Sequence, residues 1–272
     1  MVSRRSLVAA AAITIATLVT LGAADAAPAP HVAAATAYPT GIRPIHGGSD
    51  AAALVDGTAT VRKAEVVVTL PRVLLRSYAN ETSTTKNQIL TSESPAWAVT
   101  NIGRHPRFGI FPVAHSAVLA FGAIPITADL HLTQVVRHGQ IMPIVVHSKL
   151  RISPPFHAYP AHVKGEVNVR IANVLVDQVP LNVGPDCHTA VPMKLDLVGP
   201  ANKYTLFQGG PLRGTVTIPP FTGCGTGGDN LDPLLTGTIS GSGNKLMQIQ
   251  GNLGPWNTSQ KNDCGICRPP NH

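Results

Sequence analysis

Residues 166–171 read Glu-Val-Asn-Val-Arg-Ile, a strict alternation of polar or charged side chains with β-branched apolar ones. Because successive side chains of a β-strand point to opposite faces, this pattern predicts a strand with one polar and one apolar face. Similar alternation recurs in residues 126–133, 146–152 and 212–218. Strands with one face toward water are typical of antiparallel sheets.

The composition favours the same fold class. Only 13% of the 272 residues are charged, whereas 25 are glycine and 24 are proline, so turns are frequent and solvated helical faces are few. Many short strands at this spacing are typical of a sandwich or a barrel. We predict an antiparallel β-sandwich with flexible N- and C-terminal tails.

The N-terminal segment resembles an export signal. A basic Arg4-Arg5 pair precedes an apolar run over residues 7–21, and Ala24-Asp25-Ala26 has the small-x-small pattern of a cleavage site. Residues 27–60 are rich in Ala, Gly and Pro and lack periodicity, which predicts a flexible lead-in. The predicted organisation is a signal peptide (1–26), a flexible lead-in (27–60), a β-sandwich domain (61–250) and a Cys-containing tail (251–272).

Within the predicted domain, residues 65–75 form the first strand-like run, and Pro71 predicts a bend or an edge there. The polar residues 78–94 are predicted to be a long loop. An antiparallel hairpin of residues 126–134 with 144–152 requires paired positions of even sum. A sum of 278 sets Asp129 opposite Lys149 and His131 opposite His147.

Three shorter stretches carry local predictions. Asp177-Gln178 is predicted to be a two-residue hairpin turn. Asn230 is predicted to cap a single helical turn over residues 231–235. The Gly- and Ser-rich residues 237–243 are predicted to connect strands at 235–240 and 245–250, since they do not fit the G-x-S-x-G pattern of a serine nucleophile.

Four cysteines in an exported chain predict disulfides, with three possible pairings. Cys187 and Cys224 each follow a predicted strand, whereas Cys264 and Cys267 form a C-x-x-C sequence in the tail. The Arg-Pro-Pro that follows forbids the helix that activates a redox thiol. We predict Cys187–Cys224 and Cys264–Cys267, the alternative being a tail cysteine joined to the sheet.

The candidate metal ligands are His131, His147 and Asp129, which the predicted hairpin would bring to one face. The chain contains no H-E-x-x-H pattern, so we interpret them as solvated side chains and expect neither a metal nor a cofactor. The Gly-rich residues 223–228 lack the Lys-Ser/Thr of a phosphate-binding loop.

The connector at residues 153–160 is rich in proline and aromatic side chains. Phe156, His157 and Tyr159 would contact a partner there, or the rings would fold back onto the core. The net charge of +7 is scattered, which argues against a nucleic-acid groove. We expect an anionic cell-envelope component or another secreted protein as partner.

A set of motifs carries a wider resemblance: residues 174–181, 184–190, 218–225, 230–235 and 239–244. Over residues 110–250 the chain resembles uncharacterised secreted proteins of actinobacteria. The resemblance implies an exported β-rich domain and no particular activity. We expect a secreted or envelope-associated, non-catalytic β domain with a binding or structural role. The alternatives are a carrier of apolar small molecules in a β-lined cavity and a secreted hydrolase with an unrecognised site.

Overall fold

A computed structural model of the chain describes residues 49–79, 82–100, 106–120 and 124–255. These residues are nearly all β, with one α-helix among them. The longer strands are β1 (Ser49–Val61), β2 (Val66–Ala79), β4 (Ile89–Thr100), β6 (Ala114–Ala120), β7 (Ile124–Gln134), β10 (Ile144–Arg151), β12 (Ala161–Val176), β15 (Met193–Gly199), β16 (Gly210–Ile218) and β18 (Gly241–Gln250). The helix is α1 (Asp232–Ile239). The shorter strands are β3 (Thr82–Lys86), β5 (Arg107–Phe108), β8 (Val136–Arg137), β9 (Gln140–Ile141), β11 (His157–Ala158), β13 (Val179–Leu181), β14 (His188–Thr189), β17 (Phe221–Thr222) and β19 (Gly254–Pro255).

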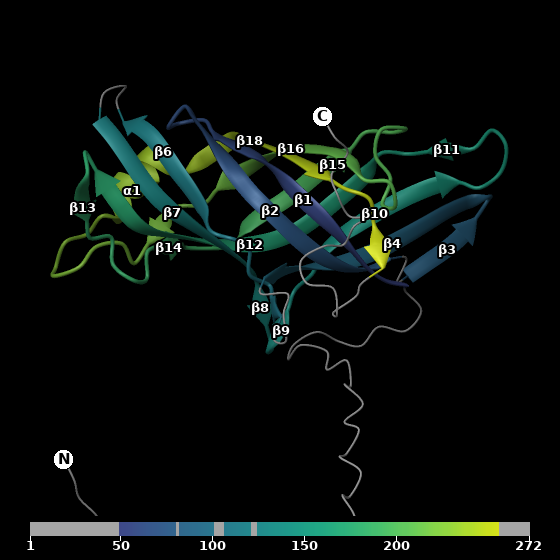
Figure 1. The fold of residues 1–272 in the computed structure, drawn as a ribbon, viewed down its shortest axis with the longest axis horizontal. Coiled ribbons are helices and arrows are strands. Elements are labelled where there is room, and N and C mark those ends of the chain that lie inside the picture. Colours follow the sequence, from purple (N-terminus) through teal and green to yellow (C-terminus); the bar gives the residue numbers. More distant parts are fainter. Residues whose placement is uncertain (1–48, 80–81, 101–105, 121–123, 256–272) are drawn as a thin grey trace, which may run out of the picture. The chain divides into compact units, whose positions relative to one another are not determined.

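Eight strands form a closed antiparallel barrel (Figure 1). Each pairs with the next in the order β1, β2, β4, β10, β12, β15, β16 and β18. β18 then returns to β1, with Val55 opposite Gln250 and Thr60 opposite Lys245. The prediction of an open sandwich is therefore wrong. Both folds require the same alternation of side chains, and only the pairing of β1 with β18 closes the sheet.

β1 includes residues 49–60, which were assigned to the flexible lead-in. Its small side chains hide the strand in the sequence, but they suit the barrel wall. A Cβ atom on Gly57 would lie 2.1 Å from the backbone oxygen of Met247 on β18. Glycine thus permits the close approach of the two strands that close the barrel.

Residues 78–94 are not a long loop. β3 and β4 form a hairpin whose turn residues, Asn87 and Gln88, have φ values of 51° and 61°. Every residue of β3 is exposed, so this strand has no apolar face to reveal it in the sequence.

The predicted hairpin of residues 126–134 with 144–152 is also wrong. β7 pairs with β6 and with the C-terminal part of β12, whereas β10 pairs with β4 and the N-terminal part of β12. β6, β7, β13, β14 and α1 lie together at one end of the sheet, opposite β3 and β11 (Figure 1). β12 is long enough to have two successive partners on the same edge.

Two local predictions have different outcomes. Asp177 and Gln178 do form a two-residue turn, with φ values of 49° and 66°, and Val176 pairs with Val179 across it. The predicted strand at 235–240 is instead part of α1. The predicted cap at Asn230 is wrong, because the N-cap residue of α1 is Leu231 and, among the described residues, no side chain caps it. The side-chain oxygen of Asn230 accepts a hydrogen bond from the backbone N–H of Asp232 in the turn before the helix. Leu235 is buried, and α1 is longer than the predicted single turn.

Candidate binding cavity

The interior of the barrel is underfilled. A cavity of about 130 Å³ lies between the strands, with walls that are almost entirely apolar. The inward side chains of β1, β2, β12, β16 and β18 supply much of its surface, among them Val55, Val73, Val169, Val216 and Leu246. Only 4% of the chain is aromatic, so few side chains are large enough to fill an eight-stranded barrel.

A second, smaller cavity of about 50 Å³ lies beside the first. The larger cavity extends toward α1, where Phe221 and Ile239 line it. The smaller one extends to Leu206 and Leu253. Five of the described residues line both cavities: Val55, Val73, Phe111, Leu195 and Gln248. The two spaces therefore lie side by side and share part of their walls.

Phe111 reaches the interior from a connecting segment. Between β5 and β6 the chain crosses the gap between β4 and β7, and the Phe111 N–H donates to the backbone oxygen of Leu132. The side chain of Gln134, on β7, bonds to β4 and to the segment before β10. Its oxygen accepts from the Ala98 N–H, and its amide nitrogen donates to the Ala96 and Met142 backbone oxygens. These side-chain hydrogen bonds take the place of backbone pairing at the point where β4 and β10 separate.

Most polar side chains at the cavity walls already have partners. Asn244 accepts from the Arg62 N–H and donates to the Gly241 oxygen. Gln250 accepts from the Tyr204 hydroxyl at 2.7 Å and donates to the Leu206 oxygen. Burial raises the pKa of Tyr204 above its ordinary value, so this hydroxyl stays protonated.

Gln248 differs from these residues. Within the part of the chain that the structure describes, its side-chain amide forms no hydrogen bond. It projects from β18 on the same face as Leu246 and Gln250 and lines both cavities. Sequence reasoning missed it because Asn244, Gln248 and Gln250 place polar side chains on the inward face of β18.

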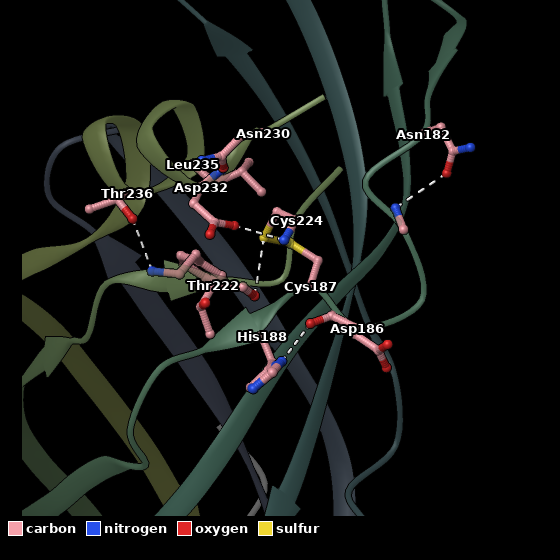
Figure 2. The surroundings of a disulfide bond; sticks show 12 residues. Asn182, Asp186, Cys187, His188, Thr222, Cys224, Asn230, Asp232, Leu235 and Thr236 are labelled. Carbon is pink, nitrogen blue, oxygen red and sulfur yellow. Dashed lines mark hydrogen bonds between the residues drawn. A yellow bond between two sulfur atoms is a disulfide. The ribbon is translucent and has the colours of Figure 1, made fainter. Parts of the chain in front are cut away.

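The cysteine pairing is confirmed for one bond. Cys187 and Cys224 form a disulfide beside β14, β17 and α1, with their Cα atoms 4.2 Å apart (Figure 2). Asp232 accepts a hydrogen bond from the Cys224 N–H, and Thr236 accepts one from the Phe221 N–H, so α1 is held against this segment. Both cysteines are buried. Cys264 and Cys267 lie outside the described residues.

The candidate metal ligands are not brought together. His147 on β10 lies opposite His162 of β12, and His131 on β7 lies opposite Arg170 of β12. At the rise of a β-strand, His162 and Arg170 are roughly 26 Å apart, so His147 and His131 lie far from each other. Asp129 therefore does not meet Lys149. Among the described residues, no group of three His, Cys, Asp or Glu side chains is placed to hold a metal ion.

Asp129, on β7, has other partners, which lie on β6 and β12. Its carboxylate lies 2.6 Å from His115 Nδ1 and accepts from Asn173 at 2.7 Å. These bonds, that of Asn173 first, lower the pKa of Asp129. Burial, and then the charge of Arg170, lower the pKa of His131.

The proposed contact loop is partly exposed. Phe156 is 72% exposed, so its ring does not fold back onto the core. His157 and Tyr159 pack edge to face, with ring centres 4.9 Å apart, and Tyr159 lines a surface hollow with His147 and Lys149. Ser240, in the Gly-rich stretch, is buried and donates to the Pro219 oxygen.

Comparison with known proteins finds no matching family, no similar curated protein and no similar solved structure. The resemblance to secreted actinobacterial proteins therefore stays a prediction. No helix among the described residues is long and apolar enough to cross a membrane.

Proposed function

We propose that this chain is a non-catalytic binding protein whose barrel holds an apolar small molecule. The observation that carries the proposal is the apolar cavity of about 130 Å³ inside the barrel. Apolar cavities of roughly 150 Å³ stay dry and take up molecules the size of benzene. Occupation by a ligand would restore dispersion contacts that an empty cavity lacks.

Export belongs to the same proposal. The basic leader and apolar run support it, and the buried Cys187–Cys224 disulfide is compatible with an oxidising compartment. An exported barrel with an apolar interior is suited to carry a water-insoluble molecule between partners.

Butylbenzene tests the binding proposal, because its ring matches the size of the larger cavity. Isothermal titration of the full chain is expected to show saturable binding at one site. Val167→Phe, which fills the larger cavity, is expected to weaken this binding at least about tenfold, since the new ring occupies the ligand's volume. Ala59→Leu fills the same cavity with a smaller change.

Val179→Phe is the matched control, because Val179 lies on β13 and is 65% exposed. It is expected to bind butylbenzene as the natural chain does. Thermal unfolding of each variant shows whether it is folded. Absence of saturable binding, or equal binding by folded Val167→Phe or Ala59→Leu, would contradict the proposal.

A further inference from the structure

We infer that the barrel selects an uncharged molecule with one hydrogen-bonding group between two apolar arms of unequal size. This inference rests on the proposed function and specifies its ligand. The structural basis is the position of Gln248 at the junction of the two cavities.

The unequal arms follow from the two volumes. The larger cavity, of about 130 Å³, accepts a ring or a branched group, whereas the smaller one, of about 50 Å³, accepts a short alkyl group. Phe111 and Gln248 line both spaces, so a ligand that occupies both passes these two side chains. Its central atoms therefore lie beside the Gln248 amide.

The hydrogen-bonding group follows from the state of that amide. The buried amides at the walls, those of Asn244 and Gln250, are engaged with protein groups on both their oxygen and their nitrogen, whereas Gln248 is half-buried. The Gln248 amide has no such partner among the described residues, and it offers both a donor and an acceptor. A carbonyl, ester or hydroxyl group of the ligand would pair with it.

The absence of charge follows from the lining residues. No Lys or Arg is among the described residues that line either cavity. The carboxylate of Asp56, in the wall of the larger cavity, is already paired with Arg72 at 3.1 Å. A buried anionic ligand would thus lack a counter-ion and would lie near a carboxylate, while a cation would have to compete with Arg72.

Three matched probes test the inference: butylbenzene, 1-phenyl-2-butanone and 2-benzylbutanoate. The ketone replaces one central methylene of butylbenzene with a carbonyl, and the third probe places a carboxylate near the same position. Calorimetry on the full chain gives the dissociation constant for each. We expect 2-benzylbutanoate to bind at least about tenfold more weakly than the ketone, because its charge is not compensated.

Gln248→Met removes the amide and nearly preserves its shape, and Gln248→Leu is a second variant should the first not fold. We expect either to raise the ratio of the ketone's dissociation constant to that of butylbenzene about fivefold, which is the worth of one ordinary hydrogen bond. The control is Gln140→Met, since Gln140 is exposed on β9. It should leave the ratio unchanged.

The outcomes separate the two proposals. If butylbenzene binds but folded Gln248 variants leave the ratio unchanged, the inference about the ligand is wrong and the binding proposal stands. Equal affinity for the carboxylate and the ketone would also overturn it. If butylbenzene itself does not bind, both proposals fail.

Discussion

At the scale of single residues, Phe111 lies at the boundary between the two cavities of the interior. Its ring lines both cavities and packs against buried residues from two clusters of the core. It comes from a connecting segment rather than from a barrel strand, so the period-2 pattern does not mark it as an inward residue. One aromatic side chain thus borders both spaces.

Phe111→Ala is expected to enlarge the space between the two cavities and to lower the free energy of unfolding by about 3 kcal/mol, because the packing contacts of the ring are lost. Alkylbenzenes longer than butylbenzene should then gain affinity relative to the natural chain. Chemical denaturation and calorimetry measure the two effects. Phe156→Ala is the control, since Phe156 is 72% exposed, and it should change neither quantity. An unchanged preference for chain length in Phe111→Ala would show that its ring does not limit the space between the cavities.

At the scale of elements, β1 closes the barrel and depends on a glycine to do so. Gly57 faces the backbone of β18, and an added Cβ atom would lie 2.1 Å from the Met247 oxygen. The backbone there must move if any side chain is introduced. The closure of the sheet is therefore sensitive to one position in a strand of small residues.

Gly57→Ala is expected to reduce the free energy of unfolding by about 1–3 kcal/mol, the usual cost of overpacking. Hydrogen exchange should increase most in β1 and β18, because the strain falls on their pairing. Gly237→Ala is a matched control within α1, where a Cβ atom would meet nothing within 4 Å. Alanine should be neutral or stabilising there. A loss of stability no greater for Gly57→Ala than for the control would contradict this account of the closure.

At the scale of the whole molecule, stability should depend on pH through a histidine on the outer face of β7. Burial and the charge of Arg170 lower the pKa of His131 below its ordinary value. The unfolded chain therefore binds a proton at this position more readily than the folded barrel. Its contribution to stability is complete above the unfolded pKa of about 6.5 and is lost as the pH falls through the folded value.

The free energy of unfolding should consequently decline between pH 7.5 and pH 5.5, and the decline should be shallower in His131→Gln. Denaturation by urea at several pH values measures both slopes. The chain contains ten other histidines, so the comparison with the variant isolates this one. Identical slopes in the two proteins would contradict the assigned role of His131. Asp129, whose pKa is also lowered, contributes in the same direction but at lower pH.

The amino-acid sequence by itself determined two features that arise from local interactions and one disulfide. Alternation over residues 166–171 identified β12, the pair Asp177-Gln178 identified its turn, and Cys187 and Cys224 were correctly paired. The strand depends on the period of its side chains, and the turn on backbone preferences. The disulfide spans 37 residues, and its prediction rests on the place of both cysteines beside predicted strands.

Only the tertiary structure decided whether the sheet is open or closed, and hence whether a cavity exists. A sandwich and a barrel have the same alternation, and the distinction rests on the pairing of β1 with β18 between distant parts of the chain. The side chains of β1 are small and show little alternation, and β18 carries polar side chains on its inward face, so neither strand predicts this pairing locally. Gln248 and Phe111 acquire their positions through the same closure, because it brings distant strands around one apolar space.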